Sequence, residues 1–234
     1  MFFFDPLYII LVLPAVIFAM IASSMVKSTF NKYSKIRSRR GITGADAARR
    51  VLDANGLYHV KIERIHGQLS DHYDPRSNVI RLSDSTYDNP SPAAIGVAAH
   101  EAGHAVQHAV GYFPIKIRSA IIPITNFGAK LTLPLILFGV LLSTYGQQFI
   151  YLAYAGVICF ALSTVFQLVT LPTEFNASRR ALVAIEQYGL LDREELGQTK
   201  KVLTAAAMTY VAALAVSLMQ LLRLFILVQG RDRR

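Results

Sequence analysis

Five consecutive residues, His100-Glu101-Ala102-Gly103-His104, have the types and spacing that suit zinc-dependent hydrolysis. On an α-helix, residues four apart lie on one face with about 6 Å of rise between them, so both imidazoles can bind one ion. The intervening glutamate could act as general base on a metal-bound water without binding the metal itself. The alternative is a helix that carries two histidines by chance. The run therefore predicts Zn²⁺ ligands at His100 and His104 and a catalytic Glu101.

The segment before this run predicts a helix that is preceded by short strands. Ser91 suits a helix N-cap, Pro92 suits the first helical position, and Gly111 would end the helix. Alternating apolar residues predict one strand over 59–65 and a second over 78–83, with turn-forming residues between them. Zincin peptidases need this order, because an upstream edge strand can hold an extended peptide beside the metal.

The composition indicates a membrane protein. Hydrophobic residues make up 53% and charged residues only 17%, whereas a soluble domain has about a quarter charged. Long apolar segments cover 7–26, 121–145, 149–171 and 202–228. The last segment contains Arg223, whose side chain we expect to reach toward the lipid headgroups. These segments predict three to four transmembrane helices.

The predicted fold is a mainly α membrane protein with an α+β zincin-like catalytic unit, consisting of a short β-sheet and the helix that carries the motif. Five regions follow along the chain: an N-terminal membrane anchor (1–26), the zincin-like catalytic region (27–120), a transmembrane hairpin (121–171), a polar region with a third-ligand helix (172–201), and a C-terminal apolar helix with a basic tail (202–234).

Basic residues are concentrated directly after the first apolar segment, and the net charge is +9. This patch, Lys27–Arg40, favours contact with an anionic lipid surface over nucleic-acid binding, because no base-reading motif or interleaved aromatic residues accompany it. A cleaved signal peptide would carry positive charge before its apolar core, where this chain has only Asp5. The positive-inside tendency predicts an integral membrane protein with the catalytic region on the cytoplasmic side. The single cysteine, Cys159, excludes an intrachain disulfide and a cysteine-based zinc site.

A catalytic zinc site usually has three protein ligands, so a third residue is required. His108 is a poor candidate, because it would lie about 12 Å from His100 along a straight helix. Glu174 is a better one: it starts a stretch with helical character, and two predicted spans between it and His104 place both on the same side of the membrane. Candidate supporting groups for the ligands, or donors for an oxyanion, are Ser178, Arg179, His108, Tyr188 and Tyr210.

The order of membrane anchor, H-E-x-x-H motif, two spans and a glutamate resembles the membrane gluzincins of the HtpX and CAAX-prenyl-protease type. The chain more closely resembles the YugP-like membrane zinc peptidases of bacteria. The similar segments are Leu69-Ser70-Asp71-His72-Tyr73-Asp74-Pro75, Val79-Ile80-Arg81-Leu82-Ser83, Ala98 to Gln107 and Glu174-Phe175-Asn176-Ala177-Ser178-Arg179-Arg180-Ala181. The resemblance implies zinc at His100, His104 and Glu174, with Glu101 as the base. Ser178 stands where the HtpX pattern has an aspartate, and a serine can orient a histidine but supplies no negative charge.

The expected function is that of a membrane zinc endopeptidase that acts on peptide or membrane-protein substrates at the membrane surface. The alternative from another class is a zinc-stabilised membrane scaffold or chaperone-like binding protein without turnover. An intramembrane protease is disfavoured, because the predicted spans contain no Asp or Glu that could supply a ligand within the membrane.

Overall fold

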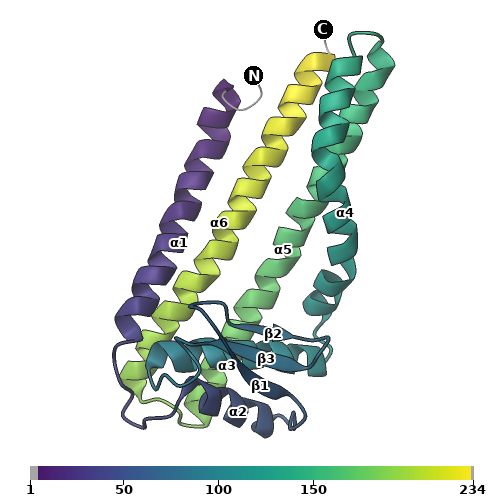
Figure 1. The fold of residues 1–234 in the computed structure, drawn as a ribbon. Helices are drawn as coiled ribbons and strands as arrows, with labels where there is room; N and C mark the ends of the chain where they lie inside the picture. Colours follow the sequence, from purple (N-terminus) through teal and green to yellow (C-terminus); the bar gives the residue numbers. More distant parts are fainter. Residues whose placement is uncertain (1–4, 233–234) are drawn as a thin grey trace. The chain divides into compact units, whose positions relative to one another are not determined.

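The structure is a computed structural model and describes residues 5–232. Helices predominate in the described chain, and three short strands form one small sheet (Figure 1). The elements are a π-helical turn (Tyr8–Val12), α1 (Leu13–Tyr33), α2 (Gly44–Ala54), β1 (Lys61–Ile65), β2 (His72–Asp74), β3 (Val79–Ser83), α3 (Pro92–Ala109), α4 (Phe113–Leu142), a 3₁₀ turn (Gln147–Phe149), α5 (Ile150–Gln187) and α6 (Arg193–Asp232). The expected architecture of an α-rich membrane protein with a small sheet is confirmed.

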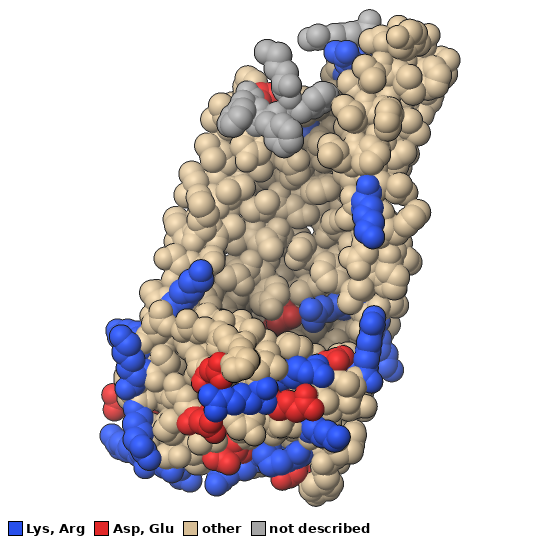
Figure 2. All heavy atoms as spheres, in the orientation of Figure 1, with Lys and Arg blue, Asp and Glu red and all other residues tan. Residues whose placement is uncertain are grey.

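The chain divides into two compact units. We call Ala22–Lys116 together with Pro172–Thr209 the polar unit, and we call Met1–Ile21, Ile117–Leu171 and Tyr210–Arg234 together the apolar unit. On the face drawn in Figure 2, acidic and basic side chains gather on the polar unit, and few lie on the apolar unit. Residues 1–4 and the last two arginines of the expected basic tail, Arg233 and Arg234, lie outside the described residues.

Among residues 5–232, four helices are long and apolar enough to cross a membrane: Tyr8–Tyr33, Phe113–Leu142, Gln147–Gln187 and Arg193–Asp232. The expectation that a helix starts near Glu174 is wrong, because α5 continues without a break through Pro172 and Glu174 to Gln187. A proline within a helix removes a single backbone donor, and membrane helices tolerate that loss when neighbouring groups compensate. Glu174 is therefore held in a helix interior.

Arg223 of α6 pairs with a carboxylate near the beginning of the chain. Its side chain is buried, and its guanidinium lies against the Asp5 carboxylate, with an Nη2 to Oδ2 distance of 2.5 Å and an Nε to Oδ2 distance of 3.1 Å. The Tyr8 ring lies 5.3 Å from the guanidinium carbon. Asp5, 218 residues away in sequence, thus offers the guanidinium an opposite charge within the apolar unit, and the expected reach of Arg223 toward the headgroups stays a prediction.

The sheet has the strand order β1-β3-β2, with β1 parallel and β2 antiparallel to β3. Strands β1 and β3 confirm the two predicted strands. The edge strand β2 was missed, because it has three residues and lies among turn formers. Asp74 stabilises the turn that follows, where its carboxylate accepts bonds from the Arg76 amide at 3.0 Å and the Ser77 hydroxyl at 2.6 Å.

The core of the polar unit forms where α2, the sheet and α5 pack around the small residues of α3. Gly103 of α3 lets α5 approach closely: a Cβ there would lie 2.8 Å from the Ala177 carbonyl oxygen of α5. At Gly96, a Cβ would lie 2.5 Å from Cγ2 of Thr199 in α6, whose hydroxyl donates to the Pro92 carbonyl at 2.8 Å. These contacts fix α5 and α6 against the helix that carries the motif.

Candidate metal centre

Helix α3 begins and ends where its sequence predicts. The Ser91 hydroxyl accepts a bond from the Ala94 amide at 3.2 Å, Pro92 occupies the first helical position, and the chain turns away at Gly111 with a φ of +63°. A regular helix over this range places His100 and His104 one above the other on a single face. Their rings meet edge to face with 4.7 Å between centroids.

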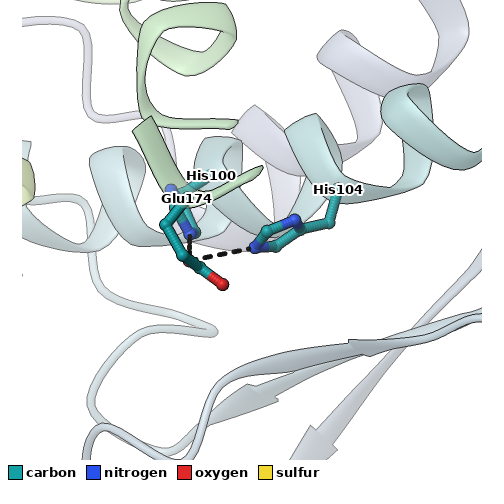
Figure 3. Close-up of side chains that lie close together, drawn as sticks. All are labelled: His100, His104 and Glu174. Atoms are coloured by element: carbon teal, nitrogen blue, oxygen red, sulfur yellow. Dashed lines mark ion pairs between the residues drawn. The ribbon is translucent and has the colours of Figure 1, made fainter. Parts of the chain in front are cut away.

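Helix α5 brings Glu174 to these two histidines (Figure 3). Oε2 of Glu174 lies 3.3 Å from Nε2 of His100 and 3.4 Å from Nε2 of His104. One ligand atom from each residue lies within 4.8 Å of the others. The carboxylate is almost fully buried, and the two imidazoles are only slightly exposed. The close approach at Gly103 makes this possible, since Ala177 lies one helical turn after Glu174.

Gln107 fixes the orientation of His104. Its Nε2 donates to the Thr173 carbonyl at 2.8 Å and to Oδ1 of Asn176 at 3.0 Å, so its carbonyl oxygen must face His104. Oε1 of Gln107 lies 3.0 Å from Nδ1 of His104, and an amide oxygen only accepts. His104 therefore carries a proton on Nδ1, and its Nε2, which faces Glu174, is the nitrogen that a metal ion could bind.

Ser178 of α5 supports the other imidazole, with its hydroxyl oxygen 3.1 Å from Nδ1 of His100. The sequence singled out Ser178 for this kind of role but did not single out Gln107. The signal for Gln107 was its position three residues after His104, which places both side chains on one helix face. Both imidazoles are thus held from α5, either directly or through Gln107.

The electrostatics of the site attract a cation. Burial lowers the pKa of His104, but its hydrogen bond to Glu174 and the charges of Glu101 and Glu174 raise that pKa above its usual range. A proton at this position is what a metal ion would replace. Two imidazole nitrogens and one carboxylate oxygen form a ligand set that suits zinc and leaves a fourth position for water. The residues therefore fit a catalytic zinc ion.

Glu101 lies on α3 next to His100 and is buried. Its Oε2 accepts a hydrogen bond of 2.9 Å from the backbone amide of Tyr73, in the edge strand β2. Its charge contributes to the raised pKa of His104, so the carboxylate lies close to the proposed ligands. The strand that sequence analysis missed thus positions the carboxylate predicted to be the base.

The other predicted residues lie elsewhere. The ring of His108 packs at a tilt on Tyr73, with 5.6 Å between centroids, and His108 is outside the cluster of ligand atoms formed within residues 5–232. Arg179 is exposed and lines a cleft of about 310 Å³ together with Tyr188. Tyr210 belongs to the apolar unit. Ser178, one of the candidate supporting residues, contacts the predicted ligand His100.

Comparison with known proteins agrees with this site. Residues 8–229 match the family described as "Putative neutral zinc metallopeptidase". The chain is 46% identical over 227 residues to the "Putative membrane protease YugP" of Bacillus subtilis (strain 168). The aligned region covers 97% of this chain and 99% of that protein. No solved structure matches. The chain belongs to this family of zinc metallopeptidases, and the resemblance read from its motifs is confirmed.

Proposed function

We propose that this member of the neutral zinc metallopeptidase family is a membrane endopeptidase of the gluzincin type, which hydrolyses peptide bonds at the membrane surface. One observation supports this most strongly: imidazole nitrogens of His100 and His104 and a carboxylate oxygen of Glu174 lie within 4.8 Å of one another. Two helices far apart in the sequence contribute these atoms. Polar contacts to the Nδ1 atoms, from Gln107 to His104 and from Ser178 to His100, orient both imidazoles.

The roles of the residues follow from their chemistry. A zinc ion held by His100, His104 and Glu174 would acidify a bound water and polarise the scissile carbonyl. Glu101 takes the proton of the attacking water and passes it to the leaving amine. The Tyr73 amide holds the Glu101 carboxylate in one orientation, so little reorganisation is needed when the proton moves.

The substrate would lie as an extended peptide along β2. This strand forms the edge of the sheet, with β3 on its inner side, and it contacts the motif helix through Tyr73 and Glu101. An exposed sheet edge binds extended peptides through main-chain hydrogen bonds, which are independent of side-chain identity. This arrangement suits unfolded or extended segments of proteins, including membrane proteins.

The test is the substitution Glu101→Gln, which keeps the shape of the side chain and removes the base. We expect cleavage of a casein-type substrate to fall by about 10²- to 10⁴-fold, with zinc content close to that of the wild type. Undiminished cleavage would contradict the proposed mechanism. If a cellular function survives Glu101→Gln but is lost with His100→Ala, the chain is instead a zinc-stabilised scaffold without turnover.

We also propose that the metal centre lies on the cytoplasmic side of a bacterial plasma membrane, since basic residues follow the first span directly. Two exposed positions test this in a Cys159→Ala background: Ser70→Cys in the polar unit and Gln148→Cys between α4 and α5. An impermeant maleimide applied to whole cells should label Gln148→Cys and should label Ser70→Cys only after permeabilisation. The reverse pattern would overturn the orientation.

A further inference from the structure

A groove between the last turns of α1 and the first turns of α6 has the composition of a phosphate-binding site. It has a volume of about 590 Å³, within the range of small-ligand sites, and all its lining residues belong to the polar unit. Three lysines, Lys32, Lys200 and Lys201, line it. Four hydroxyl groups lie among them, from Ser28, Thr29, Tyr33 and Thr204.

The three lysines have no acidic partner in the structure. Within residues 5–232, none of them makes an ion pair, and no Asp or Glu lines the groove. The ammonium group of Lys32 lies 5.3 Å from the centre of the Tyr33 ring, a cation–π contact that leaves its charge uncompensated. Three lysines in one groove repel one another, and an anion placed between them removes that repulsion.

The groove is built on a packed base. Phe30 and Tyr33 of α1 are buried in one cluster with Val202 of α6, and Tyr33 and Val202 directly follow Lys32 and Lys201 in sequence. Thr199, the residue before Lys200, is fully buried and bonded to the carbonyl of Pro92. The backbone positions that carry the charged groups are therefore fixed before any ligand binds.

The position of the groove along the two helices indicates the source of the anion. The uncharged apolar run of α1 ends at Val26, before Lys27, and the apolar run of α6 begins at Val202, after Lys201. The lysines thus lie where two candidate spans leave the apolar region, which is the level of lipid phosphates. Basic pockets between membrane helices at this level bind anionic headgroups.

We propose that this groove binds the phosphate of an anionic phospholipid headgroup, such as that of phosphatidylglycerol, with Lys32, Lys200 and Lys201 around the phosphate and the hydroxyl groups donating to its oxygens. The ligand would hold the polar unit at the membrane surface through a defined site, in addition to any diffuse attraction by the patch Lys27–Arg40.

The test measures lipid binding to the detergent-purified full chain by native mass spectrometry, with phosphatidylglycerol and phosphatidylcholine of identical acyl chains. The wild type should retain phosphatidylglycerol preferentially. The triple variant Lys32→Gln/Lys200→Gln/Lys201→Gln should bind it roughly 100-fold more weakly, because each lysine contributes about fivefold to the affinity for an anionic headgroup. The matched control Lys27→Gln/Lys35→Gln/Lys61→Gln loses the same charge at exposed positions outside the groove and should bind nearly as the wild type does.

A second variant tests the shape of the groove without removing charge. A Cβ added at Gly197 meets no heavy atom within 4 Å, so Gly197→Leu fits the helix and extends into the groove. It should block phosphatidylglycerol and leave zinc content unchanged. If both triple variants lose phosphatidylglycerol binding equally, the lipid is held by non-specific surface charge, which would overturn the proposal. If inorganic phosphate binds on its own and displaces the lipid, the groove is a free-phosphate site. That result would overturn the lipid assignment.

Discussion

The two units each place a carboxylate beside nitrogen groups, almost fully buried at Glu174 and half-buried at Asp5, but they do so in chemically opposite ways. In the apolar unit, Asp5 meets the guanidinium of Arg223, which holds the pKa of Asp5 below its usual range by donating hydrogen bonds to it. In the polar unit, Glu174 meets two imidazoles whose Nδ1 atoms are already engaged. A guanidinium always brings its own protons and charge, whereas a neutral imidazole presents a lone pair at Nε2.

This difference separates a structural ion pair from a metal centre. Asp5 and Arg223 compensate each other, so no further ion is needed between them. At Glu174, three electron-pair donors converge, and a cation between them stabilises all three at once. A buried carboxylate therefore indicates a metal site when its neighbours are lone-pair donors. Four predictions test this difference between Glu174 and Asp5.

The largest effect should come from removing a ligand. We expect His104→Ala to weaken zinc binding about 100- to 1,000-fold, because four ligands share a zinc-binding free energy of roughly 10–16 kcal/mol. The control on the same helix is His108→Ala, which should bind zinc as the wild type does because that ring packs on Tyr73. Competition with a zinc chelator measures both, and a comparable loss in the control would place the ion elsewhere on α3.

The next largest effect concerns the ion pair. Arg223→Met removes the guanidinium from beside Asp5, and we expect it to lower the free energy of unfolding by about 3 kcal/mol, because breaking a buried pair leaves one charge uncompensated. The double variant Asp5→Asn/Arg223→Met should recover most of this stability. Denaturation in detergent gives both values, and zinc content should not change in either variant. A loss of zinc with Arg223→Met would show that the two regions are not independent.

Substitution of Gln107 should have a smaller effect on the metal. Gln107→Leu removes the acceptor that fixes the Nδ1 proton of His104, and we expect zinc affinity to fall about 10- to 100-fold. Gln107→Glu keeps an acceptor toward His104 but loses the donor to Thr173 and Asn176, so its zinc affinity should lie between those of Gln107→Leu and the wild type. If Gln107→Leu binds zinc normally, the hydrogen bond does not orient the ligand.

The smallest effect is the dependence on pH. The pKa of His104 is raised in the folded chain, so protonation stabilises the metal-free protein fully below the unfolded value near 6.5, and this stabilisation is lost as the pH rises through the folded value. Zinc must displace that proton, so its apparent affinity should fall about tenfold per pH unit below the folded pKa. Titration with zinc from pH 8 to pH 5 measures this, and a flat profile would exclude displacement of a proton at this site.

The sequence was most informative where the pattern is local. Spacing within one helix predicted the motif on α3, its caps and the exclusion of His108, and apolar runs predicted the spans. Strand β2 was missed because three residues carry too little periodicity to distinguish a strand from a turn. Its contribution to the site, the Tyr73 amide bonded to Glu101, depends on tertiary packing.

Contacts between distant segments were harder to predict. Nothing in the local sequence of Arg223 indicates that it pairs with Asp5, because the two residues are 218 positions apart. The start of a helix near Glu174 was expected because Pro172 is typical of a helix boundary. Instead α5 is continuous through Pro172, and it packs closely on α3 where Ala177 meets Gly103.

The central claim is that Glu174 completes a zinc site with His100 and His104, and one measurement tests it most directly. Zinc content is measured by mass spectrometry on the purified wild type, on Glu174→Ala, and on Asp5→Asn, which changes the paired carboxylate of the other unit. We predict about one zinc per chain in the wild type and in Asp5→Asn, and almost none in Glu174→Ala. Zinc content that is unaffected by Glu174→Ala would contradict the assignment.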